Sequence, residues 1–162
     1  MMDAREKRAL EQRRLLVRYG MPLISFGLNI PGPKKVNERY HKAFSHGIES
    51  IKMLLQQKEI EVIYEEIHEN ATGFEYIASV NAEAMVLKEY MIRIEEEHML
   101  GRLFDIDVIA PGYQKISREQ LAIKERKCML CENEAYVCAR SRKHSVEELV
   151  AEINNMIESF LK

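Results

Sequence analysis

The sequence predicts an α+β fold with a ferredoxin-like core, in which a split β-α-β unit forms a mainly antiparallel sheet. Three observations predict it. Within residues 21–110, segments with strand and helix patterns follow one another in the order β-α-β-β-α-β. The strand segments are short and rich in alternating apolar residues, whereas the helix segments repeat apolar residues every three or four positions. Most glycines and prolines fall between the segments, where turns are expected: Gly20, Pro31-Gly32-Pro33, Gly73, Gly101 and Pro111-Gly112.

We expect a single domain over residues 1–162, with an added helix at each end of the core. Residues 1–20 contain a surface helix rich in Arg, Glu, Leu and Ala, which Gly20 ends. Residues 21–110 form the α+β core, and residues 111–144 form a segment rich in cysteine and arginine. Residues 145–162 contain a helix with a continuous apolar stripe, in which Ser145 and Glu148 match a capping box. This stripe predicts a core helix.

The core elements follow in order. Residues 21–30 predict a strand that ends at Pro31-Gly32-Pro33, and residues 36–57 predict an amphipathic helix. Residues 59–68 and 74–80 predict two strands joined by a turn at 70–73. We expect Asn81 to cap a helix over 82–97, followed by a strong strand over 102–110. Ser117 and Gln120 match a second capping box in the segment that follows.

Composition excludes several classes of protein. Hydrophobic residues make up 46% and charged residues 31%, with a net charge of −2 and a pI near 6.2, so a dedicated nucleic-acid binder is not expected. No apolar run reaches the ~20 residues of a membrane span. Residues 1–18 are charged throughout, which excludes a secretory signal and predicts a cytoplasmic protein. In that compartment, three cysteines are not a disulfide framework.

The strand over 102–110 carries the clearest catalytic pattern. Asp105 and Asp107 should point to one face with Cα atoms about 6.5 Å apart, while the apolar residues between them point to the other. Two such carboxylates can hold Mg²⁺ together with substrate phosphates. Arg102 lies beside them and could bind phosphate oxygens. The alternative is an exposed acidic face of an antiparallel strand.

Two further segments could contribute to the same chemistry. His98 precedes the strand and could act as a general base or orient a carboxylate, or it could simply end a helix. The turn over 29–35 contains Asn29, Gly32 and Lys35, and it could bind phosphate through exposed backbone and lysine at a helix start. Its alternative role is an ordinary strand-to-helix turn.

The cysteines lie within eleven residues of one another. Together with His144, they could form a Cys₃His zinc site, whose members are Cys128, Cys131, Cys138 and His144. A redox Cys-x-x-Cys pair or three reduced cysteines are the alternatives. Basic residues surround the cluster and could bind a polyphosphate or an acidic partner; they are Lys124, Arg126, Lys127, Arg140, Arg142 and Lys143.

Four blocks of the sequence, taken together, resemble the holo-citrate lyase synthases, which are apo-citrate lyase phosphoribosyl-dephospho-CoA transferases. The order and spacing of the blocks agree from about Leu15 to the last helix. The blocks are Leu28-Asn29-Ile30-Pro31-Gly32-Pro33-x-Lys35, Ala71-Thr72-Gly73, His98-x-Leu100-Gly101-Arg102-Leu103-Phe104-Asp105-Ile106-Asp107-Val108, and Cys128-x2-Cys131 with Cys138-x-Arg140-Ser141-Arg142-x-His144.

The resemblance implies an enzyme that transfers a nucleotidyl group from triphosphoribosyl-dephospho-CoA to a serine of the acyl carrier (gamma) subunit of citrate lyase. Pyrophosphate would leave. Mg²⁺ on Asp105 and Asp107 would neutralise phosphate charge, and Asp107 or His98 would take the serine proton. A second set would hold the triphosphate: Arg102, Lys35, Arg140 and Arg142. The competing hypotheses are a zinc-containing adaptor for an acidic protein and a transferase for a malonate decarboxylase carrier.

Overall fold

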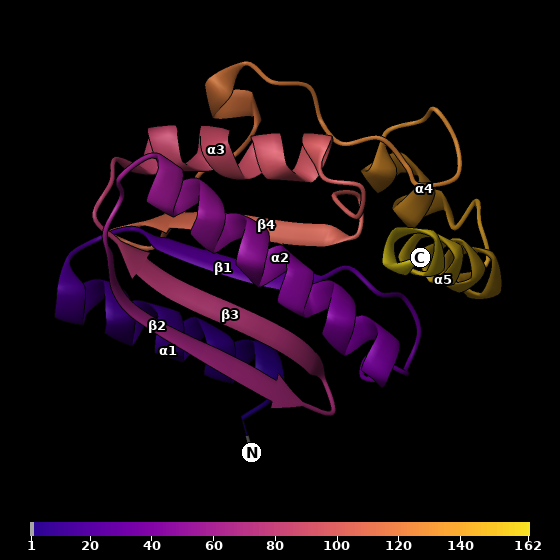
Figure 1. Ribbon diagram of the computed structural model, residues 1–162, viewed down its shortest axis with the longest axis horizontal. Helices are drawn as coiled ribbons and strands as arrows, with labels where there is room; N and C mark the ends of the chain where they lie inside the picture. The colour runs from indigo at the N-terminus through magenta and orange to yellow at the C-terminus, as the bar shows by residue number, and fades with distance from the viewer. Residues whose placement is uncertain (1) are drawn as a thin grey trace.

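The computed structural model describes residues 2–162, which form five α-helices and a five-stranded antiparallel sheet (Figure 1). A mixed α/β fold is therefore confirmed. In chain order, the elements are α1 (Ala4–Tyr19), β1 (Leu23–Leu28), α2 (Glu38–Gln57), β2 (Val62–Asn70), β3 (Gly73–Val80), α3 (Ala84–Glu97), β4 (Phe104–Ala110), β5 (Gln114–Lys115), α4 (Ala135–Ser141) and α5 (Val146–Leu161), with a 3₁₀ turn at Glu119–Leu121.

The strands lie in the order β2-β3-β1-β4-β5, and every neighbouring pair is antiparallel. β1 is therefore the central strand, paired with β3 on one side and β4 on the other. Its register places Ser25 opposite Asp107 and Gly27 opposite Asp105. This pairing decides which side chains of β1 and β4 meet on each face of the sheet.

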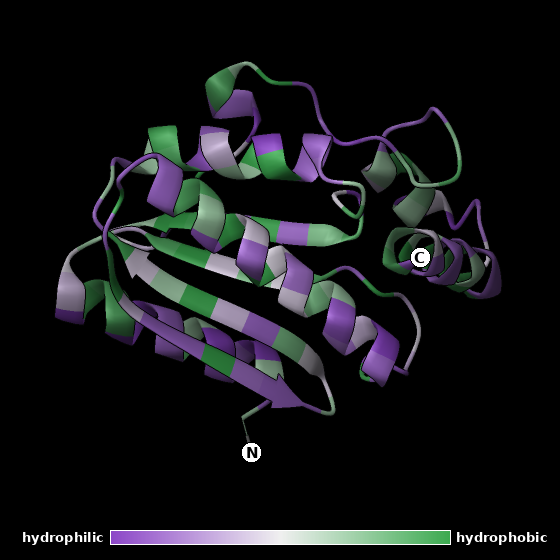
Figure 2. Ribbon diagram, viewed as in Figure 1, coloured by the Kyte–Doolittle hydropathy of each residue, from purple (hydrophilic) through white to green (hydrophobic). Residues whose placement is uncertain are grey.

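Helices cover both faces of the sheet, and each face has its own apolar core. α2 and α3 pack on one face over the larger core, which includes Phe26, Phe104 and Ile106. α1 packs on the opposite face, where Leu15 and Leu16 contact a smaller cluster that includes Leu23, Ile77 and Ile109. Figure 2 shows the consequence for the strands: β4 is largely hydrophobic, whereas the edge strand β2 is largely hydrophilic.

The helix ends agree with the sequence in most places. Gly20 ends α1 in a left-handed conformation with φ 65°, and Ser145 and Glu148 form the expected capping box of α5. The capping bonds between Ser117 and Gln120 are also present, beside the 3₁₀ turn. Ile153 and Ile157 of α5 are buried, while the two ends of its apolar stripe are exposed. No described helix combines the length and hydrophobicity that a membrane span requires.

Two local predictions were wrong, and two short elements were not predicted. Asn81 does not cap α3, because its backbone N–H donates to the Glu61 carbonyl and the helix begins later, after Glu83. β4 begins at Phe104, so Arg102 lies in the preceding turn and not on the strand. The short elements β5 and α4 lie in a segment for which the sequence pattern predicted neither.

Candidate functional site

Asp105 and Asp107 open into a cavity of about 500 Å³ on the face of the sheet that α1 covers, which we call the carboxylate pocket. The expected common face of the two carboxylates is therefore present, and the apolar residues of β4 point to the opposite core. Charged residues from four other parts of the chain reach the same cavity: Arg5 and Arg8 of α1, Lys35 of the turn before α2, Glu75 of β3 and Lys115 of β5.

Gly27 of β1 forms the floor of this pocket. It lies directly opposite Asp105 in the sheet and therefore presents bare backbone beside that carboxylate. A Cβ atom at this position would lie 3.1 Å from the Phe74 carbonyl oxygen, which is a tight contact. A glycine inside a strand often marks a place where a ligand approaches the backbone closely.

A chain of hydrogen bonds between side chains supports one wall of the pocket. Ser25 Oγ donates to Glu75 Oε2 at 2.9 Å, and Gln12 Nε2 donates to Ser25 Oγ at 3.2 Å. Tyr113 Oη donates to Gln12 Oε1 at 3.1 Å, and Arg8 Nε lies 3.2 Å from Glu75 Oε2. The chain joins α1, β1, β3 and the β4–β5 turn, so it fixes the wall of the pocket relative to the sheet.

The pocket raises the pKa of two of its carboxyl groups. Desolvation in the pocket raises the pKa of Asp105, and repulsion from Asp107 and Glu95 raises it further. Burial raises the pKa of Glu75, against the opposing effects of Arg8 and Ser25. Lys115 Nζ lies 3.6 Å from Asp107 Oδ2 at the rim. An added cation would relieve the repulsion between Asp105 and Asp107.

This arrangement suits an anionic ligand that carries its own cation. The paired carboxylates offer the oxygen ligands that Mg²⁺ prefers, and the cations around them could bind phosphate oxygens. Lys35 is held in place by donating to the Ile30 carbonyl oxygen, so its ammonium group lies at the pocket wall. The carboxylate pocket therefore has the chemistry expected for binding a polyphosphate.

The structure separates Arg102 from the two carboxylates. Its Nη1 donates to the backbone carbonyls of Cys128 at 3.0 Å and Met129 at 3.4 Å. Arg102 lines a second cavity of about 690 Å³, which also contains the predicted residues Asn29 and Arg142. We call it the cationic cavity after its four basic residues, Arg102, Arg126, Lys127 and Arg142.

Gly32 and Arg140 lie outside both cavities. Gly32 has φ 84°, and a Cβ atom there would lie 3.0 Å from Val146 Cγ1, so this glycine brings the turn against the start of α5. Arg140 is exposed on α4. The four basic residues predicted to hold one triphosphate are therefore divided: Lys35 lines the carboxylate pocket, Arg102 and Arg142 line the cationic cavity, and Arg140 lines neither.

His98 is not brought to the carboxylates. Its Nδ1 accepts the backbone N–H of Leu100 at 2.9 Å, and its ring lies against Phe104 and Phe160 with centroid distances of 4.8 Å and 5.2 Å. Phe104 belongs to the core on the face of β4 opposite Asp105. Burial and repulsion from His46 lower the pKa of His98. Its position at the end of α3 matches the alternative, a residue that ends the helix.

The end of β1 and the residues after it separate the two cavities. Gly27, Leu28 and Ile30 line the carboxylate pocket, whereas Asn29 and Pro31 line the cationic cavity. From Leu28 to Pro31 the chain thus presents successive residues to opposite sides. A long ligand could contact both cavities across this segment.

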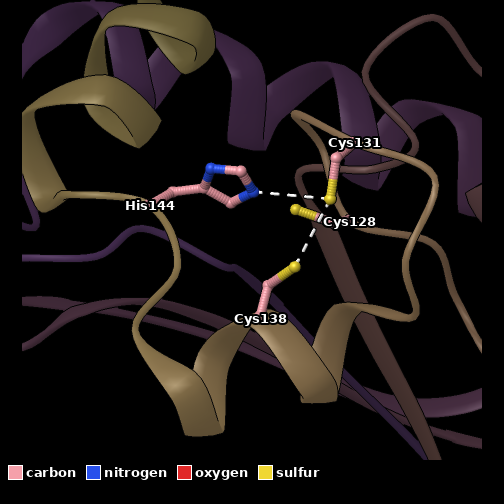
Figure 3. A group of neighbouring side chains, drawn as sticks. All are labelled: Cys128, Cys131, Cys138 and His144. Atoms are coloured by element: carbon pink, nitrogen blue, oxygen red, sulfur yellow. Dashed lines mark hydrogen bonds between the residues drawn. The ribbon is translucent and has the colours of Figure 1, made fainter.

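The three cysteines and His144 converge, as the sequence predicted (Figure 3). Their potential ligand atoms all lie within 4.8 Å of one another. Cys131 Sγ is 3.4 Å from both Cys138 Sγ and His144 Nε2. Hydrogen bonds from His144 and from the Asn133 backbone lower the pKa of Cys131 to about 6, whereas burial raises that of Cys138 to about 11. This Cys₃His cluster could hold a metal ion such as zinc.

Several residues of the carboxylate pocket were not predicted from the sequence. They are Arg5, Arg8, Gln12, Ser25, Gly27, Glu75 and Lys115. Glu75 offered one usable signal, since a charged residue inside the apolar strand 74–80 needs a partner. The residues of α1 offered no such signal, because the polar residues that face the pocket are of the same types as those that face solvent.

The comparisons with known proteins agree over the whole length of the chain. The family model for apo-citrate lyase phosphoribosyl-dephospho-CoA transferase matches residues 1–160. A probable apo-citrate lyase phosphoribosyl-dephospho-CoA transferase of Vibrio cholerae serotype O1 (strain M66-2) is 38% identical over 157 residues, covering 96% of this chain and 88% of that protein. The transferase of Escherichia coli O157:H7 (strain EC4115 / EHEC) is 34% identical over 161 residues, covering 99% and 86%. The chain belongs to the apo-citrate lyase phosphoribosyl-dephospho-CoA transferase family.

Proposed function

We propose that this protein is a transferase that attaches the prosthetic group of citrate lyase to its acyl carrier subunit. Its donor is 2′-(5″-triphosphoribosyl)-3′-dephospho-CoA, and its acceptor is a serine of the apo acyl carrier. The relatives are named for transfer of phosphoribosyl-dephospho-CoA to apo-citrate lyase. The observation that carries the proposal is the carboxylate pocket, in which the paired carboxylates of Asp105 and Asp107, a third carboxylate at Glu75 and four cations surround bare backbone at Gly27.

The reaction is a nucleotidyl transfer. The serine Oγ of the carrier attacks the α-phosphorus of the donor, forming a phosphodiester, while the bond from that phosphorus to pyrophosphate breaks. The serine proton passes to a base, and pyrophosphate leaves with the electron pair of the broken bond. Because the nucleophile belongs to the partner, the enzyme needs no internal nucleophile; its task is to position the phosphates and stabilise their charge.

The roles follow from the positions of the side chains. Asp105 and Asp107 would hold Mg²⁺, which would neutralise the charge of the triphosphate when bound. Lys35 and the α1 arginines Arg5 and Arg8 would bind the phosphate oxygens and the departing pyrophosphate. Asp107, near the rim beside Lys115, is the better placed of the two bases considered, because His98 lies on the other face of β4.

The cationic cavity gives a place for the other end of the donor. The donor is long, and the segment from Gly27 to Pro31 borders both cavities. Arg102 and Arg142 would bind the diphosphate of the dephospho-CoA part, and the apolar residues Met129, Val146 and Leu149 would contact its uncharged groups. In this assignment, Asn29, Arg102 and Arg142 bind the substrate. Arg102 therefore has no role in the chemical step, unlike the role that the resemblance implied.

The proposal includes a ferredoxin-like core. The strand order β2-β3-β1-β4 supports it, because β3 lies between β1 and β2 and so splits the β1-α2-β2 unit. In this arrangement, the end of β1 and the start of β4 lie side by side, which brings Gly27 next to Asp105.

The test is a carrier-loading assay with the purified chain, the apo acyl carrier of citrate lyase, the donor and Mg²⁺. We expect the intact mass of the carrier to rise by the donor minus pyrophosphate, with equal release of pyrophosphate. Asp105→Asn and Asp107→Asn should each slow loading by roughly 100-fold or more, since charge stabilisation in the transition state is lost. Glu89→Gln, at an exposed position on α3, is the matched control.

Each outcome decides a part of the proposal. Loading that persists in both aspartate variants would refute the carboxylate site but keep the activity. Loading of a malonate decarboxylase carrier in preference to the citrate lyase carrier would correct the acceptor. No loading of either carrier would refute the transfer and favour a binding protein for an acidic partner.

A further inference from the structure

We propose that Cys128, Cys131, Cys138 and His144 bind one structural Zn²⁺ ion, and that this ion holds the wall of the cationic cavity in place. The cluster lies apart from the carboxylates, and transfer at the carboxylate pocket assigns it no task. Its two parts are the turn over 128–133 and the stretch from α4 to the start of α5.

The spacing of the ligand atoms matches a tetrahedral zinc site. With Zn–S bonds of about 2.3 Å and a Zn–N bond of about 2.0 Å, two sulfurs lie about 3.8 Å apart and sulfur and nitrogen about 3.5 Å apart. The structure has 3.4 Å for Cys131 Sγ to Cys138 Sγ and for Cys131 Sγ to His144 Nε2, and no pair exceeds 4.8 Å. Small side-chain adjustments would therefore complete the coordination.

The backbone after Cys128 is already arranged for a thiolate. The Leu130 N–H, two residues after the cysteine, donates to Cys128 Sγ at 3.4 Å. N–H groups directed at sulfur stabilise its negative charge, which is the form that binds zinc.

The segment has no apolar core that could fold it without a metal. Between residues 119 and 152, the only buried residues are Cys128 and Cys138. The larger apolar side chains of α4 point to solvent, with Tyr136 52% and Val137 42% exposed. A structural zinc ion commonly supplies the missing stabilisation in such a segment.

Zinc at this position would fix the cationic cavity. Cys128, Cys138 and His144 line that cavity themselves, and Arg102 donates to the carbonyl of Cys128. Ser145, the cap of α5, follows His144 directly. The ion would therefore join the Arg102 anchor, α4 and the start of α5. Four protein ligands leave no open coordination position, so the role is structural and not catalytic.

The test measures metal in the full chain, purified without a polyhistidine tag. We expect one zinc ion per chain by mass spectrometry of the metal, and the visible spectrum of tetrahedral cobalt with thiolate ligands after replacement by Co²⁺. Cys131→Ser and His144→Ala should weaken zinc affinity by more than roughly 100-fold, beyond the usual effect of altering a neighbour of a ligand. His41→Ala, at an exposed histidine of α2, is the matched control.

A second measurement uses the unmodified chain, so the test does not depend on how the variants fold. Chelation of zinc should raise hydrogen exchange in residues 126–145 while β1, β3 and β4 stay protected. A chain that lacks zinc and contains a Cys131–Cys138 disulfide, or one that keeps its zinc in both variants, would overturn the proposal. Metal content is independent of carrier loading, so the two proposals fail separately.

Discussion

The carboxylate pocket and the Cys₃His cluster are built in opposite ways. The pocket lies on a sheet whose two faces are packed by apolar cores, and its polar groups extend from regular strands and a helix. The cluster lies in the segment over 111–144, which has only short elements and whose buried residues besides Cys128 and Cys138 are Ile116 and Arg118. The sheet thus provides a rigid base for acidic groups, whereas the segment over 111–144 is attached to the core by polar contacts of its own side chains.

That difference teaches where stability and function are coupled. On the sheet, the repulsion of Asp105 by Asp107 and by Glu95 of α3 works against the fold, and apolar packing compensates. In the outer segment the charged contacts themselves hold the structure: Arg118 binds Glu95 at 2.8 Å, and Arg126 Nη1 binds the Phe104 carbonyl at 2.7 Å. Removing a charge should therefore have opposite effects on stability in the two regions.

The largest expected effect is at Asp105. Asp105→Asn should slow carrier loading by roughly 100-fold or more while making the fold more stable at neutral pH without metal. The pKa of Asp105 is raised on folding, so its contribution to stability falls as the pH rises from the ordinary value of 3.8 through the folded value. Asparagine lacks this penalty. The gain should disappear below the ordinary value.

Urea unfolding with EDTA at several pH values measures this difference, with Glu89→Gln as the control. A variant less stable than the parent at neutral pH would mean that favourable contacts hold the Asp105 carboxylate, and the contrast between the two regions would fail.

The next largest effect is on stability alone. Arg118 and Glu95 are 8% and 6% exposed, and Glu95 also accepts the Ile106 N–H of β4 at 3.0 Å. Arg118→Met should lower the free energy of unfolding by about 3 kcal/mol, because it leaves a buried carboxylate with a weaker partner. Arg93→Met, at an exposed position of α3, should change it little. Adding Glu95→Leu to the first variant should recover part of the loss; additive losses would contradict a direct pair.

The smallest effect concerns the cap beside the proposed zinc ligand. Ser145→Ala should lower the free energy of unfolding by about 1 kcal/mol, since it removes the side-chain half of the capping box. Ser159→Ala, exposed on the same helix, should be close to neutral. Hydrogen exchange at the first turn of α5 would localise the change. Equal exchange in the parent and the Ser145 variant would show that the cluster alone fixes this helix start.

The sequence was most informative where one element contains the whole signal. The alternation over 104–108 predicted the common face of Asp105 and Asp107, and Ser145 with Glu148 predicted the start of α5. The Cys₃His cluster was predictable because its four members lie close in the chain. In each case, the local pattern and the tertiary contacts favour the same structure.

Prediction failed where distant segments decide. The Asn81 N–H donates to the carbonyl of Glu61, just before β2, and α3 begins only after Glu83. The sequence placed Arg102 beside the aspartates, but in the structure the turn at 101–103 directs its side chain to the carbonyls of Cys128 and Met129. The walls of the carboxylate pocket come from α1, β1 and β3, which no spacing rule connects. Predicting Glu75 in that wall required the sheet order.

The segment from Leu28 to Pro31 should leave a visible signature in a complete substitution scan. Leu28 and Ile30 line one cavity, while Asn29 and Pro31 line the other. The effect of substitution should therefore alternate from one residue to the next along this segment. The two sets of alternating positions should show their effects in different assays. Substitutions of Leu28 and Ile30 should change the rate of the transfer step, whereas substitutions of Asn29 and Pro31 should change the affinity for the dephospho-CoA part of the donor.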